Sequence, residues 1–266
     1  MTHTSHYEVY AIKYAESTDR KRSDSFIFDE THDVPHDLDF FVWVVRNHER
    51  TLLIDTGFDR GEAASRGRPI LFEPAEALAA IGISPQRIDA AVITHLHFDH
   101  AGGLHQFPNA RFHLQEAEMV YATGPCMCHP VLQHPFTADH VCNMVRRVYE
   151  GKVIFHDGDE TIAPGVTVHK IGGHSRGLQA VRVETANGPL VLASDAAHFY
   201  ENYEARSPFP LVVDVEEMLN GFERLGQLAG DRGLVIPGHD PEVRQRFPSA
   251  FEQAGPDVRR LDLGER

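Results

Sequence analysis

The sequence predicts an α/β protein in which two packed β-sheets are covered by helices on their outer faces. Apolar, β-branched runs typical of strands occur in both halves of the 266-residue chain, and helical patterns follow them in each half. No internal repeat, low-complexity tract or Gly/Ser linker divides the chain. We therefore expect a single domain over residues 1–266.

The first half of the chain alternates predicted strands with short helices. Two apolar runs on either side of the polar segment 47–50 predict a hairpin. The expected strands are 7–14, 40–46, 51–55 and 88–94. The expected helices are 76–81, 115–121 and 139–149.

The second half of the chain also contains predicted strands and a predicted helix. A helix is expected over 215–228, where Met218, Phe222 and Leu225 recur at helical spacing. The expected strands are 153–155, 166–170, 178–184, 190–193 and 234–236.

Composition restricts the partners and the location of the protein. A net charge of −14 argues against a nucleic-acid backbone or an anionic membrane as the main partner. A basic cluster at 20–22 could contact an anion, but short charged runs are usually solvated surface. The first thirty residues lack the apolar core of a signal peptide, and no run is long enough to span a bilayer. With only three cysteines and no disulfide framework, we expect a cytoplasmic protein, and we leave a homodimer open.

Residues 94–103, THLHFDHAGG, carry the main functional motif. Their H-x-H-x-D-H spacing offers four donors, His95, His97, Asp99 and His100. We expect these donors on a loop, because the strand 88–94 precedes them and the sequence AGG does not favour a rigid helix. Imidazole nitrogens and carboxylate oxygens suit zinc and, to a lesser extent, manganese, iron or cobalt.

Three later segments place a further donor at the end of a predicted strand. His174 follows strand 166–170, Asp195 follows strand 190–193, and His239 follows strand 234–236. Other histidines, among them His113, His134, His140, His156 and His169, have no such setting and are expected to be ordinary.

Seven donors are enough for two divalent ions. In this assignment one ion is held by His95, His97 and His174, the other by Asp99, His100 and His239, and Asp195 bridges the pair. A bridging water or hydroxide would complete both shells, as in many hydrolytic sites.

The segment Gly173-His174-Ser175-Arg176-Gly177 also matches the G-x-S-x-G nucleophile elbow of serine hydrolases. That motif needs a helix directly after the serine. Here the following residues predict two strands joined at Asn187-Gly188, a dipeptide typical of hairpin turns. The context therefore argues against a nucleophilic serine.

The motifs LLIDTG, THLHFDHAGG, GGHSRG, LASDA and PGHD together resemble the metallo-β-lactamase superfamily, over nearly the whole chain. The resemblance implies a four-layer αβ/βα sandwich with helices outside two mixed sheets. It also implies that Asp55 orients the metal loop rather than binding metal. Within the superfamily the sequence is most similar to N-acyl-homoserine lactonases and related γ-lactonases.

One position departs from the lactonase pattern. Many of these enzymes carry a tyrosine three residues after the bridging aspartate, where this chain has His198, with Tyr200 two residues further on. Either side chain could orient the substrate and stabilise the oxyanion, and Asp99 could relay a proton to the leaving oxygen. An apolar acyl channel is a further expectation, lined by Phe28, Phe58, Phe98, Phe136, Phe199 and Phe209.

The expected function is therefore a quorum-quenching lactonase. A metal-bridging hydroxide, with two ions that are zinc in the first instance, would attack the carbonyl of a small-molecule lactone. Two alternatives stay open on the sequence: a hydrolase of another ester or thioester, with glyoxalase II-like chemistry at the same site, and a non-catalytic metal-binding module.

Overall fold

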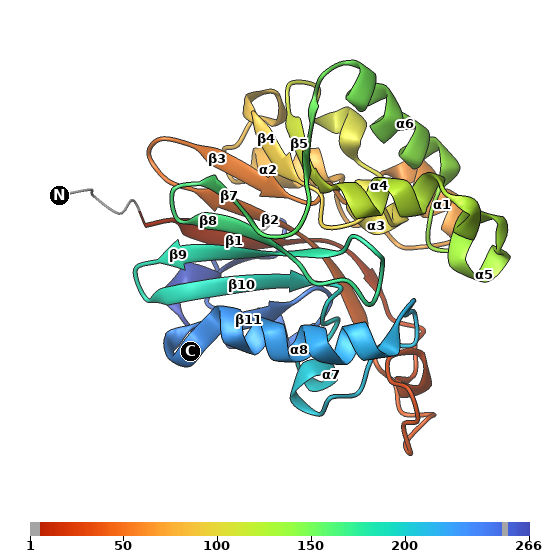
Figure 1. Cartoon of the computed structure of the whole chain (residues 1–266). Coiled ribbons are helices and arrows are strands. Elements are labelled where there is room, and N and C mark those ends of the chain that lie inside the picture. The colour runs from red at the N-terminus through yellow and green to blue at the C-terminus, as the bar shows by residue number, and fades with distance from the viewer. Residues whose placement is uncertain (1–5, 252–254) are drawn as a thin grey trace.

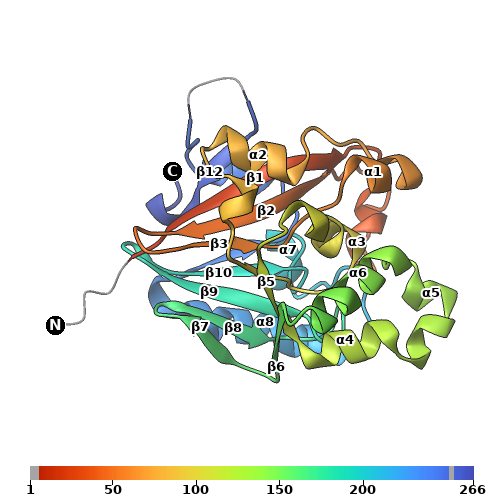
Figure 2. The ribbon, with the colours of Figure 1, turned by 90° about the horizontal axis from the view of Figure 1, so that it is seen from above.

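A computed structural model describes residues 6–251 and 255–266 of the chain. Two β-sheets lie face to face, and helices cover the outer faces of both (Figures 1 and 2). The expected sandwich is confirmed.

The first sheet has seven strands and is antiparallel on one side and parallel on the other. In spatial order its strands are β12 (Val258–Arg260), β1 (Glu8–Ser17), β2 (Leu38–Arg46), β3 (Thr51–Ile54), β4 (Ala90–Val92), β5 (Arg111–Gln115) and β6 (Val153–His156). The parallel part runs from β3 to β6.

The second sheet has five strands, and only its β10–β11 pair is parallel. Its spatial order is β11 (Leu234–Pro237), β10 (Gly188–Ser194), β9 (Gln179–Thr185), β8 (Val166–Lys170) and β7 (Glu160–Ala163). The expected hairpin turn is confirmed, because Gly188 pairs with Thr185.

Nine α-helices connect these strands within the described residues: α1 (Arg60–Arg66), α2 (Pro74–Ala80), α3 (Phe98–Ala101), α4 (Glu116–Thr123), α5 (Pro130–Gln133), α6 (Ala138–Tyr149), α7 (Tyr200–Glu204), α8 (Val215–Ala229) and α9 (Glu242–Arg246). The Asp214 side chain caps α8 by accepting a hydrogen bond from the Glu217 amide. In Figure 1, α8 lies along the outer face of the second sheet.

Three apolar clusters form the layers of the core. One lies between the sheets and includes Trp43, Val181 and Phe247. A second fills the space between the first sheet and its helices, and a third packs Phe222 and Leu225 of α8 against the second sheet. Because strands from both halves of the chain share the central cluster, the two sheets are held as one packed unit.

Most predicted elements form within a few residues of their expected ends. Three strands were not predicted, β5, β7 and β12, and each is only three to five residues long. The expectation that all four motif donors lie on a loop is wrong for two of them, since Asp99 and His100 belong to the one-turn helix α3. Over the described ranges, no helix is both long and apolar enough to cross a membrane.

The strand directions place the motifs together. Strands β3 and β4 are parallel, as are β10 and β11, and β8 runs in the same sense as β10 because both are antiparallel to β9. The carboxyl ends of these strands therefore meet at one edge of the sandwich, where the predicted donors follow them.

A buried histidine pair joins two strands in the parallel part of the first sheet. His113 of β5 and His156 of β6 stack with their ring planes 3° apart, and Nδ1 of His113 lies 2.9 Å from Nε2 of His156. Burial lowers the pKa of His113 to about 4, and the positive charges of His156 and Arg111 contribute to this. His113 is therefore neutral in the folded protein at pH 7.

The lowered pKa of His113 predicts that the folded protein loses stability in mild acid. The unfolded chain protonates His113 near pH 6.5 and the folded chain only near 4, so the unfolded state binds more protons between these values and stability falls as pH drops from 6.5 to 4. We expect His113 to account for up to about 3 kcal/mol of this loss. Urea unfolding at pH 7.5 and pH 5 will show a flatter pH dependence for His113→Gln than for the exposed control His48→Gln. An unchanged dependence in His113→Gln would contradict this.

Candidate metal centre

Donors from four chain segments meet at the shared edge of the two sheets. His95 and His97 follow β4, His174 follows β8, Asp195 follows β10 and His239 follows β11. All five side chains are buried. The seven donors expected from the sequence thus lie together, although they come from distant parts of the chain.

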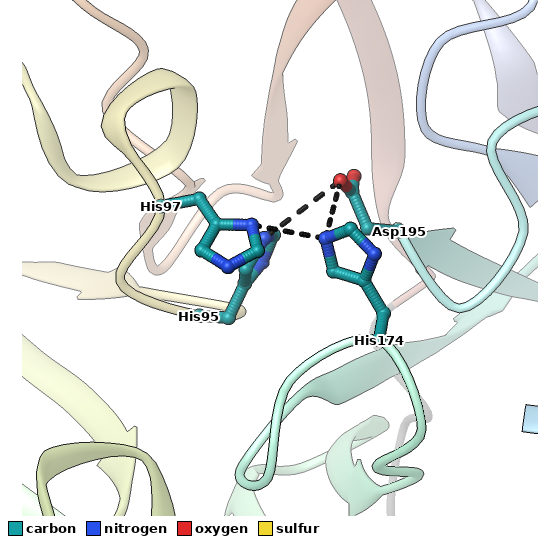
Figure 3. Close-up of side chains that lie close together, drawn as sticks. All are labelled: His95, His97, His174 and Asp195. Atoms are coloured by element: carbon teal, nitrogen blue, oxygen red, sulfur yellow. Dashed lines mark hydrogen bonds and ion pairs between the residues drawn. The ribbon is translucent and has the colours of Figure 1, made fainter. Parts of the chain in front are cut away.

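The first group of donors consists of His95, His97, His174 and Asp195, whose ligand atoms all lie within 4.8 Å of one another. Figure 3 shows the three imidazoles and the carboxylate converging on one point from separate segments. Nε2 of His174 is 3.0 Å from Nδ1 of His97 and 3.1 Å from Oδ2 of Asp195. Such crowding of basic nitrogens favours a shared cation between them.

The second group consists of Asp99, His100 and His239. Oδ1 of Asp195 lies 3.2 Å from Nε2 of His100 and 3.0 Å from Nε2 of His239. The other oxygen of Asp195, Oδ2, faces the first group. One carboxylate therefore presents a separate oxygen atom to each group.

Hydrogen bonds on the far side of the rings orient three of the histidines. Nδ1 of His174 lies 2.6 Å from the Leu211 carbonyl oxygen, and Nδ1 of His239 lies 2.8 Å from the Asp39 carbonyl oxygen. Because a carbonyl oxygen only accepts, each Nδ1 must donate its proton. In the neutral imidazole Nε2 is then the unprotonated nitrogen, and it faces the donor groups. His100 is held in the same way by a carboxylate.

That carboxylate belongs to Asp55, at the carboxyl end of β3. It accepts hydrogen bonds from the Thr94 amide at 2.7 Å and the Thr94 hydroxyl at 2.8 Å, and it lies 2.7 Å from Nδ1 of His100. Asp55 adopts a positive φ of 60°, a conformation that non-glycine residues rarely adopt. It contacts the motif from behind and belongs to neither donor group, so its supporting role stays a prediction that these contacts favour.

A second buried carboxylate, Glu118 of α4, joins the first motif to the His174 segment. It accepts hydrogen bonds from the Leu96 amide at 2.9 Å, the Ser175 hydroxyl at 2.5 Å and the Gly177 amide at 2.9 Å. Ser175 is thus a donor to Glu118 and is followed by strand β9, which confirms that the segment is not a nucleophile elbow. No sequence pattern indicated this role for Glu118.

Burial and mutual charge set the protonation of the cluster. Burial lowers the pKa of His95 and His97 well below the ordinary value, and neighbouring imidazoles lower it further. Burial would also lower the pKa of His100, but three neighbouring carboxylates raise it well above the ordinary value. Burial would raise the pKa of Asp195, but the surrounding imidazoles, led by His198, lower it well below the usual range.

These residues fit divalent metal ions. The donors are the nitrogens and oxygens that zinc takes in proteins. The Nε2 atoms of His95 and His100 are buried and have no hydrogen-bond partner in the described part of the chain. Since a buried polar atom without a partner is costly, an ion at each group would satisfy atoms that the protein leaves open.

A cavity of about 150 Å³ opens onto both groups. It is lined by site residues that include Asp99, Asp195 and His198, by the apolar residues Phe98, Phe209 and Leu211, and by three arginines, Arg20, Arg66 and Arg68. A larger hollow of about 480 Å³ at the turn between β2 and β3 contains none of the donors.

The two candidates for substrate orientation are separated by the fold. His198 lines the cavity, with Nε2 3.0 Å from Oδ2 of Asp195 and its ring stacked on Phe209 at 3.6 Å. Tyr200 packs instead into the core between the sheets, beneath the guanidinium of Arg246 at 3.6 Å. The structure brings His198 into the site and leaves Tyr200 outside it.

The expected aromatic channel is only partly present. Phe98 and Phe209 line the cavity, and Phe136 packs edge-on against His97. Phe28 is 97% exposed, whereas Phe58 and Phe199 are buried in the helix-covered core of the first sheet.

A four-layer sandwich with a buried cluster of imidazoles and carboxylates at one sheet edge defines a metal-dependent protein of the hydrolytic type. A family model of the metallo-beta-lactamase superfamily matches residues 41–244. The chain belongs to this superfamily.

Known relatives and structures agree with this assignment. The chain is 29% identical to an N-acyl homoserine lactonase from Bacillus sp, over 77% of this chain and 83% of the relative. It is 26% identical to a probable metallo-hydrolase of Mycobacterium tuberculosis, over 76% of this chain and 71% of that protein. A solved N-acyl homoserine lactone hydrolase, with N-hexanoyl-L-homoserine bound at its metal centre, superposes with a TM-score of 0.76 at 23% identity, over 91% of this chain and 96% of that one.

The buried Glu118 carboxylate predicts a strong effect on metal affinity. Glu118→Ala leaves three hydrogen-bond donors beside the His95–His97 and His174 segments without an acceptor, so we expect metal affinity to fall about 10- to 100-fold. Glu118→Gln keeps one acceptor oxygen and should lie between the wild type and the alanine variant. Competition with a chelator measures the effect, with the exposed Glu116→Ala on the same helix as the control. Equal affinity in Glu116→Ala and Glu118→Ala would show that Glu118 does not position the donors.

Proposed function

We propose that this metal-dependent hydrolase opens the ring of a lactone, with N-acyl homoserine lactones as the first class to test. The observation that carries the proposal is the placement of Asp195, whose two oxygens face two separate donor groups beneath one cavity. The lactonases among the chain's relatives support the choice of substrate. Opening a lactone adds water to the carbonyl carbon, breaks the ring carbon–oxygen bond and gives a hydroxy acid.

Two divalent ions, zinc in the first instance, would be held as the sequence predicts: His95, His97 and His174 on one side, Asp99, His100 and His239 on the other, and Asp195 between them. When bound, they would supply Lewis acidity and an activated water at neutral pH. His198 forms a third group with Asp195 and His239 and is therefore near enough to contact either the ions or the substrate.

Two cavity residues, Asp99 and His198, would assist the reaction in different ways. Asp99 lines the cavity and can carry a proton to the leaving ring oxygen, which would otherwise depart as a costly alkoxide. His198 presents an imidazole fixed between Asp195 and the Phe209 ring, and it can hold the substrate carbonyl in place. We propose one domain for the chain, because strands from both halves share the core beneath the site. Quorum quenching, a cytoplasmic location and a homodimer remain predictions.

Metal removal tests the proposed chemistry. The metal-loaded protein should release one proton per lactone opened, with about two ions per chain by elemental analysis. Exhaustive chelation should abolish the activity, and adding zinc back should restore it. Undiminished activity in the chelated protein would exclude the proposed mechanism, and cleavage of thioesters but not lactones would exclude the proposed substrate.

The position of His198 predicts a loss of rate rather than a loss of metal. His198→Gln removes the cavity imidazole, and we expect kcat/KM to fall about 100-fold, as for other groups that stabilise a developing charge. Tyr200→Phe is the matched control, because the Tyr200 hydroxyl is buried in the core without a hydrogen-bond partner among the described residues. It should leave kcat/KM and metal content unchanged. If His198→Gln binds only one ion, His198 is a ligand instead.

A further inference from the structure

Three arginines line the cavity, and one of them is already neutralised. Arg66 pairs with Glu62 at 2.5 Å, donates a hydrogen bond to the Thr137 hydroxyl at 2.9 Å and lies 4.0 Å above the ring of Phe98. Its charge is compensated within the protein. Arg66 is therefore a structural part of the cavity wall.

The other two, Arg20 and Arg68, form no ion pair with a carboxylate in the described part of the chain. Arg20 donates hydrogen bonds to the Asp24 carbonyl oxygen at 2.6 Å and the Ser25 hydroxyl at 3.3 Å, and its Nε is buried without a partner. Arg68 donates to the Ser17 hydroxyl at 2.8 Å. Both guanidinium groups thus rest on neutral acceptors.

The two charges also act on each other. Burial lowers the pKa of Arg20; the charge of the Asp24 carboxylate opposes this lowering, and the positive charge of Arg68 adds to it. The chain carries 39 acidic residues against 25 basic ones, so carboxylates are plentiful elsewhere on the molecule. Within the described residues, two neighbouring guanidiniums without an ion-paired carboxylate line the cavity that opens onto the donor groups. Their burial costs free energy that a bound anion would offset.

A short stack of rings connects Arg20 to the site. Its guanidinium carbon lies 5.5 Å from the centre of the Phe209 ring, Phe209 stacks on His198, and His198 contacts Asp195. One molecule in the cavity can therefore reach the donor groups and the arginines together. A plain alkyl chain would gain nothing from the guanidiniums and would remove part of their hydration.

We propose that Arg20 and Arg68 bind an anionic group of the substrate, a carboxylate or a phosphate, carried at some distance from the carbonyl that is hydrolysed. This inference rests on the proposed lactone opening and narrows its substrate class. Arginine suits either anion because its planar guanidinium donates two parallel hydrogen bonds.

The test uses three N-acyl homoserine lactones that differ only at the end of the acyl chain: methyl, carboxylate or phosphate monoester. For the metal-loaded wild type we expect kcat/KM for one of the anionic substrates to exceed that for the methyl substrate by about 10- to 100-fold. The anion with the larger ratio identifies the natural group. Raising the ionic strength should reduce the ratio, because the arginines are partly exposed to solvent.

Substitution of the two arginines tests whether they cause the preference for anionic substrates. Arg68→Gln and Arg20→Gln should each bring the anionic-to-methyl ratio close to one. Arg224→Gln is the control, because Arg224 is an exposed arginine paired with Asp159, and it should leave the ratio and the activity unchanged. A wild-type ratio of one or less, or a ratio that neither arginine substitution changes, overturns the inference.

A binding measurement separates this inference from the proposed function. If none of the three lactones is opened, the proposed function fails, and calorimetry with their ring-opened products then decides the role of the arginines. An anionic product that binds at least about tenfold more tightly than the methyl product, with the difference lost in Arg68→Gln, supports the inference. Equal Kd values overturn it.

Discussion

The carboxylate of Asp195 is the interaction on which the site depends. Its two oxygens lie within 3.2 Å of imidazoles from three segments, His100, His174 and His239. A fully buried carboxylate costs several kcal/mol of hydration, and contacts with imidazoles repay this only in part. Divalent metal at this position would remove that cost, and metal binding and the packing of the strand ends would then stabilise each other.

The two sheets supply the rigidity that such an arrangement needs. The parallel pairs β3–β4 and β10–β11 bring their carboxyl ends to the same edge, and the backbone turns sharply where the chain leaves the strands. Asp55, which follows β3, and Ser194, which ends β10, both adopt positive φ. The Thr94 hydroxyl contacts both, at 2.8 Å from the Asp55 carboxylate and 2.9 Å from the Ser194 hydroxyl. Strain at these turns is thus balanced by buried hydrogen bonds beneath the donors.

The sequence predicted the parts of the site that depend on local pattern. Spacing within 94–100 and position at strand ends identified the seven donors, because a strand end fixes where a side chain goes. Glu118 was missed because its three partners lie in other segments and come together only on folding. Tyr200 was misplaced because it begins helix α7, which turns its side chain into the core while His198, two residues earlier, faces the cavity. Strand β12 is too short to show a pattern and is defined by its pairing with β1.

The substrate specificity of this protein is harder to predict from sequence than the metal-binding chemistry of its site. The donor groups sit on strand ends, whose positions the hydrophobic pattern determines. Arg20 and Arg68 lie outside the regular helices and strands, and nothing in the short basic run at 20–22 distinguishes Arg20 from Arg22. In the fold, Arg22 pairs with Asp29 and Glu201, whereas Arg20 lines the cavity and has no such ion pair among the described residues. Loops can change which charges face the cavity without disturbing the sheets, so one metal centre can serve many substrates.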